Sequence, residues 1–254
     1  MKALLCHNRK RGLPSRWNGT ILALFILLTV AIELPAQIGE RRSALSIGGN
    51  GGVTISSVDF DPTVKQKELV SPTFGVTLRY TCEKYFSTVC ALQAELNYVR
   101  IGWKEEVLNS LSEPLPDTYE RTLSYAQIPL LARLSWGKEE RGMMFALLLG
   151  PQISFYLGQE TDKSTVWTLN TEGNPDRPNN VYQQYELDPQ RKFDYGLTGG
   201  VGAELNTAIG HFTLEGRYYY GLGDIFDNAK KDPFARSAHR TIVIKATYLF
   251  DIFK

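Results

Sequence analysis

Charged residues that recur within alternating apolar segments are the first candidates for chemistry in this chain of 254 residues. The set holds four basic and four acidic side chains: Arg79, Arg133, Arg217 and Lys245, with Glu95, Asp194, Glu204 and Glu215. Charges enclosed on one inner face are stable only when they are paired, hydrogen-bonded or hydrated. We therefore predict a balanced ion-pair network, with a proton or ion path through the carboxylates as the alternative.

Histidines and a group of late acidic residues are the next candidates, for hydrolysis and for calcium binding. After residue 36 the histidines are His211 and His239. A hydrolase would need one of them beside a nucleophile at an exposed rim, and His239 is the sole candidate for that place. Asp224, Asp227 and Asp232 lack the regular ligand spacing of a calcium loop. We predict no catalytic, metal or cofactor site, and no enzymatic activity.

The cysteines offer redox chemistry. Cys82 and Cys90 remain once the N-terminal Cys6 is set aside, and their separation fits neither a C-x-x-C redox pair nor a four-ligand zinc site. In an oxidising compartment two cysteines that flank one turn can bridge. The sequence thus predicts a possible disulfide between Cys82 and Cys90, with two unpaired thiols as the alternative.

The N-terminus has the features of an export signal. Basic residues such as Lys2, Arg9 and Arg16 precede an apolar run over 21–32, and Ala36 offers a small residue for cleavage. The apolar run is shorter than the roughly 20 residues that a helix needs to cross a bilayer. We predict a signal peptide over 1–36 and one domain over 37–254, with an uncleaved N-terminal anchor as the alternative.

Charge composition excludes one class of partner. The chain has 28 Lys and Arg against 27 Asp and Glu. Because the predicted signal peptide carries most of its charge as basic residues, the remaining chain is mildly acidic. No electrostatic attraction to nucleic acid is expected, so we predict no nucleic-acid partner.

Apolar residues alternate with other residues in segment after segment, which is the periodicity of β-strands. Eight such segments follow the predicted signal, the first of them glycine-rich and weaker: 44–56, 74–80, 90–98, 126–136, 145–157, 193–205, 212–222 and 241–250. Their length of about ten residues matches a tilted strand that crosses hydrocarbon. In the fifth segment the alternation turns Leu147 and Leu149 toward lipid and Gln152 and Ser154 toward the lumen.

The connections distinguish a membrane barrel from a soluble one. The links over 57–70, 103–121, 158–191 and 223–239 are long and polar, whereas those over 81–88, 137–142 and 206–210 are short. Long loops on one side and short turns on the other are typical of outer-membrane barrels. The sequence predicts an all-β protein, an eight-stranded antiparallel up-and-down transmembrane β-barrel with short periplasmic turns and long extracellular loops. A β-sandwich with an aromatic core is the alternative.

Aromatic residues gather at both ends of the predicted strands, as the two interfaces of a bilayer favour. The predicted outer girdle contains Trp103, Phe155, Phe193, Tyr195 and Tyr220, and the inner girdle contains Tyr80, Trp136, Phe145, Phe212, Tyr248 and Phe250.

Several strings of residues resemble a known family. They run over 91–98 (ALQAELNY), 125–131 (YAQIPLL), 145–151 (FALLLGP), 193–202 (FDYGLTGGVG) and 214–222 (LEGRYYYGL), in order along the chain. The sequence resembles the PorT-like outer-membrane β-barrel family of Bacteroidota from about residue 43 to Phe250. The resemblance implies an eight-strand barrel in the bacterial outer membrane, mostly of unassigned function, with one member implied in the gliding-associated (type IX) secretion system. Cys82, Cys90 and the tail over 251–254 depart from that pattern.

We expect the protein to act as a surface-interaction or secretion-accessory element whose lumen is plugged and non-conducting. Its expected partners are outer-membrane lipid and lipopolysaccharide, together with other envelope or secretion-system proteins. A narrow passive channel for small solutes is the first alternative, and a barrel enzyme acting on lipid or peptide is the second. An eight-strand barrel is just wide enough for its own side chains to fill, which favours the plugged lumen.

Overall fold

The computed structural model describes residues 39–139, 141–230 and 232–253. The predicted signal peptide, residues 1–36, lies outside the described residues. Gly39–Lys254 forms one compact unit.

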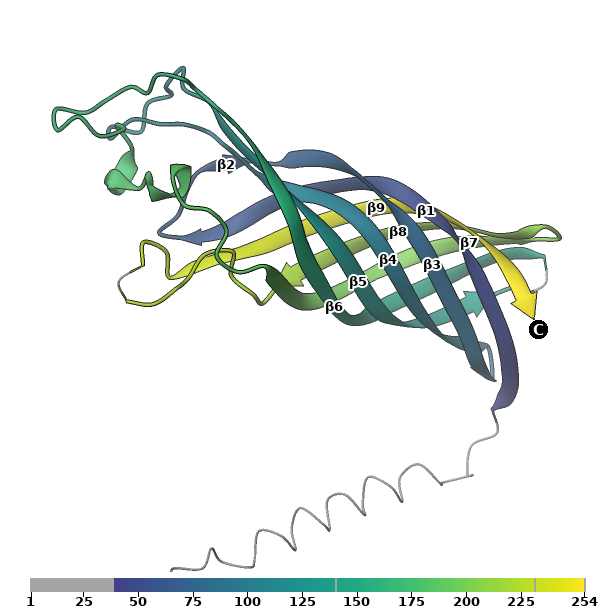
Figure 1. Cartoon of the computed structure of the whole chain (residues 1–254). Helices are drawn as coiled ribbons and strands as arrows, with labels where there is room; N and C mark the ends of the chain where they lie inside the picture. The colour runs from purple at the N-terminus through teal and green to yellow at the C-terminus, as the bar shows by residue number, and fades with distance from the viewer. Residues whose placement is uncertain (1–38, 140, 231, 254) are drawn as a thin grey trace, which may run out of the picture. The chain divides into compact units, whose positions relative to one another are not determined.

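Antiparallel strands form the whole framework of this unit (Figure 1). Their bounds are β1 Glu40–Asp61, β2 Gln66–Lys67, β3 Leu69–Tyr85, β4 Thr88–Glu105, β5 Tyr119–Gly137, β6 Gly142–Lys163, β7 Phe193–Thr207, β8 Gly210–Gly221 and β9 Arg236–Phe253. The sheet runs β4-β3-β1-β9-β8-β7-β6-β5 and closes by pairing β5 with β4. The two-residue β2 adds only to the end of β4. The prediction of an eight-stranded up-and-down barrel is therefore confirmed.

Closure of the sheet explains why this sequence can cross a bilayer. Each of the eight long strands has two hydrogen-bonded neighbours, so in the described part of the chain these strands leave no unpaired edge of backbone N–H and C=O groups toward lipid. First and last strands meet along their length, with Ile47 opposite Phe250 and Val53 opposite Ile244. The ends of the described chain thus lie at one end of the barrel, which we name the turn end.

Short turns occupy the turn end, over 86–87, 138–141 and 208–209, and the opposite end, named the loop end, carries the long connections. In Figure 1 the C-terminus marks the turn end, and the loops gather on the far side. The turn before β8 requires Gly210, whose φ is 142° and whose added Cβ would lie 2.4 Å from the carbonyl oxygen of Leu249. A side chain there would disrupt the β8–β9 pairing.

Several strands are longer than the alternation predicts, and the loops are correspondingly shorter. β1 has 22 residues rather than the weak segment over 44–56, and the first link spans 62–68 rather than 57–70. The other long links span 106–118, 164–192 and 222–235. Above the lipid the outer face becomes polar, so the apolar alternation fades while backbone pairing continues.

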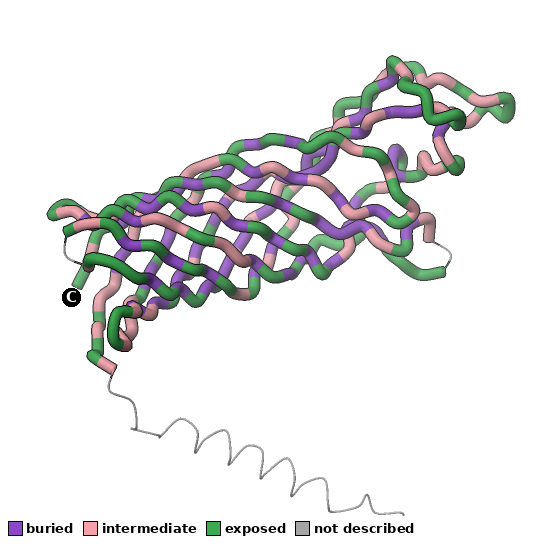
Figure 2. The backbone as a smooth tube through the Cα atoms, turned by 180° about the vertical axis from the view of Figure 1, so that it is seen from behind, coloured by how far each residue is buried: buried purple, intermediate pink, exposed green. Residues whose placement is uncertain are grey.

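Burial alternates residue by residue along the strands, as the change between purple and green or pink along the tube in Figure 2 shows. In β6, Leu147 and Leu149 are exposed while Gln152 and Ser154 are buried. This agrees with the face predicted for each of these four residues. The outer face is an apolar band, and the lumen is filled with polar, charged and aromatic side chains.

Candidate functional site

Ion pairs fill the half of the lumen nearest the turn end. Glu204 of β7 accepts hydrogen bonds at one oxygen, Oε2, from both Arg79 of β3 and Arg133 of β5, each at 2.6 Å. Arg133 also donates to Oε1 of Glu215 on β8 at 2.9 Å. Three carboxylate and guanidinium pairs from four strands therefore tie opposite walls of the barrel together.

A second group of ion pairs continues this network toward the loop end. Arg217 donates to Glu95 Oε1 at 2.7 Å and also pairs with Glu215. Lys245 pairs with Glu95 and lies 4.0 Å from Glu215. Gln93 links the two groups, because it accepts from Arg79 at 3.2 Å and donates to Glu95 at 2.7 Å. All these side chains are buried, so we name the seven charged ones, with Gln93, the ion network.

Asp194 was predicted as the eighth member, and the structure places it elsewhere. Its Oδ2 accepts a hydrogen bond of 2.8 Å from Tyr219, and no cation within the described ranges forms a salt bridge with it. Asp194 stands ten residues before Glu204 on β7, about 33 Å along the strand. Alternation assigns a residue to a face but not to a depth. All eight predicted residues are buried, as expected of the inner face. The network itself has four cations and three carboxylates, so the predicted balance of charge within it is wrong.

Glycines make room for the long charged side chains. Gly200 stands opposite Arg217 and Gly52 opposite Lys245 in the strand pairing. A Cβ added at Gly200 would lie 2.8 Å from Cγ of Arg217, and one added at Gly52 would lie 2.7 Å from Cβ of Lys245. Since interiors are close-packed, larger residues at these positions would displace the network.

Aromatic side chains close the lumen at the loop end. We name this cluster the aromatic cap, and its buried rings are Phe60, Trp103, Tyr119, Tyr125, Tyr185, Phe226 and Phe234. Phe60 and Trp103 meet edge to face with centroids 5.2 Å apart. Trp103 was predicted in the outer girdle, but it is 0% exposed. It shares the inward parity of Gln93 and Glu95 on β4, so its assignment to the membrane surface was wrong.

The 164–192 loop contributes to the cap by folding back over the barrel mouth. Tyr185 stacks on Trp167 at 4.5 Å and donates to Glu105 Oε2 at 2.8 Å. Arg177 donates to Tyr185 at 2.8 Å and to Asp117 at 3.0 Å. Burial raises the pKa of Glu105, an effect that hydrogen bonds from Tyr185 and other donors only partly offset. The loop is thus fastened to β4 through Glu105 and to the neighbouring 106–118 loop through Asp117.

Little space remains between the cap and the ion network. A cavity of about 20 Å³ lies there, lined by residues that include Asn97, Gln152 and Tyr219. That volume holds about one water molecule. Within the part of the chain that the structure describes, the lumen is therefore closed both by aromatic packing and by ion pairs.

Both histidines lie away from any exposed rim on the loop side. His239 is 0% exposed, and its Nε2 is 3.2 Å from the hydroxyl of Tyr125. Its predicted place at the end of the last loop is therefore corrected to the lumen wall beneath the cap. His211 lies at the turn end, 2.6 Å from Asn206 Oδ1 and 3.0 Å from Asp251 Oδ1.

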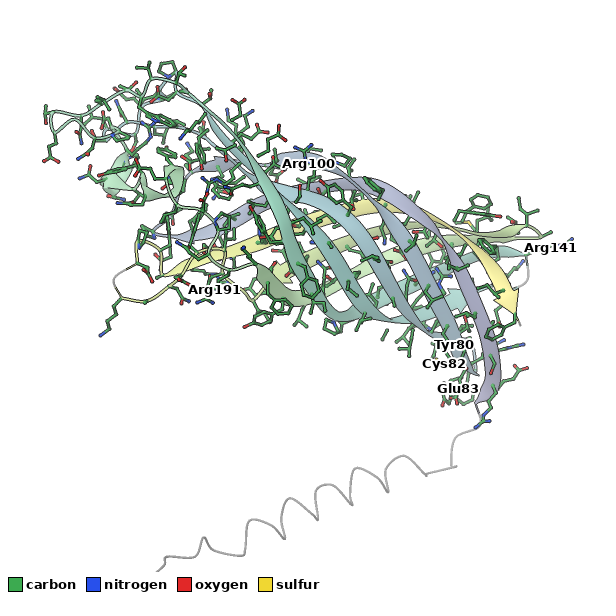
Figure 3. The ribbon with its side chains drawn as sticks, viewed as in Figure 1. Tyr80, Cys82, Glu83, Arg100, Arg141 and Arg191 are labelled. Carbon is green, nitrogen blue, oxygen red and sulfur yellow. The ribbon has the colours of Figure 1, made fainter. Side chains whose placement is uncertain are left out.

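Cys82 and Cys90 are free thiols in the structure, so the possible disulfide is not formed in it. The β3–β4 register shifts between Thr81, opposite Ala91, and Glu83, opposite Cys90. Cys82 is therefore the extra residue of a β-bulge without a direct cross-strand partner. Figure 3 labels it with Tyr80 and Glu83 at the turn end, far from Arg100 and Arg191 in the other half.

The late acidic residues stabilise their own loop. Asp224 and Asp232 accept backbone N–H bonds, and Asp227 pairs with Arg191 at 3.4 Å. Among the residues that the structure describes, no group of three or more His, Cys, Asp or Glu side chains is arranged to hold a metal ion. No helix in the described ranges is long and apolar enough to span a membrane.

A closed ring of strands with an apolar outside and a plugged inside defines a transmembrane β-barrel. Residues 35–227 match the family described as outer membrane protein beta-barrel domain. The chain belongs to this family and is a protein of the bacterial outer membrane. In such barrels short turns are periplasmic and long loops extracellular, so the turn end is periplasmic and the loop end extracellular.

Solved structures of outer-membrane proteins are similar to this chain at low identity. OprG from Pseudomonas aeruginosa is 12% identical with a TM-score of 0.45, over 84% of this chain and 98% of that chain. The attachment invasion locus protein Ail of Yersinia pestis is 14% identical with a TM-score of 0.35, over 83% and 99%. Neisserial surface protein A is 11% identical with a TM-score of 0.38, over 82% and 98%. No curated protein matches the sequence significantly.

Proposed function

We propose that this barrel acts at the cell surface as an interaction or secretion-accessory element, with a plugged lumen that conducts nothing. The observation that supports this function is the double closure by the aromatic cap and the ion network, with about 20 Å³ between them. Activity then lies in the extracellular loops and in contacts with other envelope or secretion-system proteins. Membership in the PorT-like group of Bacteroidota belongs to the same proposal.

Two extracellular loops offer a shaped contact surface. The turn over 109–113 is held by Asn109, whose Oδ1 accepts the N–H groups of Leu111 and Glu113. The turn over 170–174 repeats this design, because Oδ1 of Asn170 accepts the N–H groups of Glu172 and Asn174. We name these two turns the loop fingers. Each is also closed by an isolated β-bridge at its base.

The loop fingers are joined, and exposed apolar side chains lie on the first finger and in the segment before the second. The backbone N–H of Ser110 donates to Oδ1 of Asp176 at 3.0 Å, which links one finger to the other loop. Leu111 is 77% exposed, and Val166, which precedes the second finger in the sequence, is 81% exposed. Exposed apolar side chains on ordered loops favour a protein partner, since their burial would stabilise a complex.

An enzymatic role is not proposed. A hydrolase needs a nucleophile and a base that substrate can reach, and His239, the sole candidate base, is enclosed beneath the cap. Outer-membrane lipid and lipopolysaccharide are expected around the apolar band as the barrel's surroundings.

Exchange of the fingers tests this function. In a strain that lacks the gene, a variant with 109–113 and 170–174 replaced by glycine-serine turns should leave a folded barrel whose gel mobility changes on boiling. It should fail to restore the adhesion or protein-secretion defect of that strain. A matched variant, Glu172→Gln, changes one exposed finger residue and should restore it fully. Full restoration by the fingerless barrel would overturn the proposal.

A further inference from the structure

The periplasmic mouth of the barrel is open, in contrast to the extracellular mouth. A cavity of about 390 Å³ lies there, near the lower limit of small-molecule sites. Each of the eight long strands contributes to its lining, from Ser46 on β1 to Asp251 on β9, together with Glu139 of the 138–141 turn. We name this cavity the periplasmic vestibule.

The inner wall of the vestibule belongs to the ion network. Arg79, Arg133 and Glu204 line both. A single oxygen, Oε2 of Glu204, accepts from both guanidinium groups and also from the hydroxyl of Thr213. Two cations thus share one carboxylate at the point where the network meets the vestibule, although Arg133 has a second partner in Glu215.

Charge in the network does not balance. With Asp194 outside it, the network holds four cations and three carboxylates, all of them buried. An uncompensated charge away from water costs several kcal/mol unless a counterion reaches it. The extracellular side is closed by the aromatic cap, so a counterion has access from the periplasm alone.

The rim of the vestibule is consistent with that access. The lining as a whole has four arginines and three carboxylates, and two of the arginines reach solvent, since Arg41 is exposed and Arg42 half-buried. The rim carboxylates already have partners: Glu139 pairs with Lys84 at 2.5 Å, and Asp251 accepts from Ser46 at 2.6 Å. No residue in the described ranges forms a salt bridge with Arg41.

We propose that the periplasmic vestibule binds the oxyanion group, carboxylate or phosphate, of a small soluble periplasmic molecule. Guanidinium groups are suited to such ligands because their planar forks match the two oxygens of a carboxylate or phosphate. The bound anion lies against Arg79 and Arg133 and neutralises the excess cation of the network. Binding leaves the lumen closed, so this site is independent of the loop fingers and of the proposed surface function.

Thermal unfolding of the purified barrel in an uncharged detergent tests the site. Inorganic phosphate or acetate, compared with sodium chloride at equal ionic strength, should raise the midpoint because the anion binds the folded state. Arg79→Gln removes the excess cation, so at least ten times more anion should be needed for the same rise in the midpoint. Glu204→Gln increases the excess and should strengthen it. A binding site thus predicts opposite changes in the anion dependence of the two variants. A purely structural role of these residues would weaken the anion dependence in both.

Two further variants keep the test decisive if a network variant fails to fold. Arg41→Gln, at the rim and outside the network, should weaken the anion dependence about two- to threefold. Arg100→Gln, on the outer surface of the barrel, is the matched control and should leave it unchanged. The proposal would be overturned if the wild type showed no anion response, or if Arg41→Gln and Arg100→Gln responded equally. A response to an anionic lipid but not to phosphate or acetate would also overturn it.

Discussion

The two halves of the lumen are closed by different physical means. At the extracellular end aromatic rings of the strands pack against residues of a folded-back loop, and apolar burial holds them. At the periplasmic end buried charges from six strands hold one another, and the open vestibule lies beside them. Rings tolerate modest changes of shape, whereas a buried ion network depends on each partner. Substitutions in the periplasmic half should therefore destabilise the barrel strongly, whereas the extracellular half should adapt to changes in its side chains.

Removal of a network carboxylate should have the largest effect. Glu215→Gln leaves four buried cations with two carboxylates, so the free energy of unfolding should fall by about 3–5 kcal/mol. Asp194→Asn is the matched control, since Asp194 accepts one hydrogen bond from Tyr219 and pairs with no described cation. Urea unfolding in phospholipid bilayers measures both. Equal losses of unfolding free energy in the two variants would show that Asp194 matters as much as a network carboxylate, and would contradict the contrast between the halves.

A charge on the outer face should cost somewhat less. Leu147→Arg places a cation in the apolar band and should destabilise the barrel by about 2–4 kcal/mol. Gln152→Glu, on the lumen face of the same strand, should cost less, because Gln152 lines the same small cavity as Arg217 and Lys245 and the new carboxylate offsets the excess cation. Urea unfolding that ranks the two costs in reverse would show that the register assigned to β6 is off by one residue.

Loss of the loop anchor should have a smaller and local effect. Tyr185→Ala removes a stacked ring and leaves Glu105 without one buried donor, so docking of the 164–192 loop should weaken by about 1–3 kcal/mol. Limited proteolysis within 164–192 should speed up while urea unfolding of the barrel stays near the wild type. Tyr185→Phe keeps the ring but loses the hydroxyl, so its rate of proteolysis should lie between those of the wild type and Tyr185→Ala. A global loss as large as that of Glu215→Gln would contradict an adaptable extracellular half.

Acidification should produce the smallest change. The pKa of Glu105, the last residue of β4, is raised by its burial beneath the docked loop. Its stabilising contribution to docking is therefore complete below the unfolded pKa and is lost as pH rises through the folded pKa. The loop should therefore dock more tightly near pH 4.5 than at pH 7. Fluorescence quenching of the tryptophans by acrylamide measures this difference, and Glu105→Gln should abolish it. A loop that loosens on acidification in the wild type alone would reverse the sign of this argument.

Sequence patterns predicted the barrel and its faces because a period of two residues is a direct consequence of strand geometry. They did not predict depth, which is why Asp194 is wrongly assigned to the network. Trp103 is wrongly assigned to the girdle for another reason: its place near a strand end suggests an interface, although its parity with Gln93 and Glu95 turns it inward. The charge excess followed only from counting ion pairs across strands that are distant in sequence. Anchoring by Tyr185 was also missed, because a lone aromatic residue in a polar loop has no periodicity that would reveal its partner Glu105.

Closure of the lumen is the central claim, and ion conductance across planar bilayers tests it most directly. The intact barrel should show no steady conductance, and Tyr185→Ala should show none either, because the ion network still closes the periplasmic half. Steady conductance of the intact protein that is lost on substitution of Lys245 or Glu215, yet retained when the 164–192 loop is trimmed, would contradict this account and show a channel.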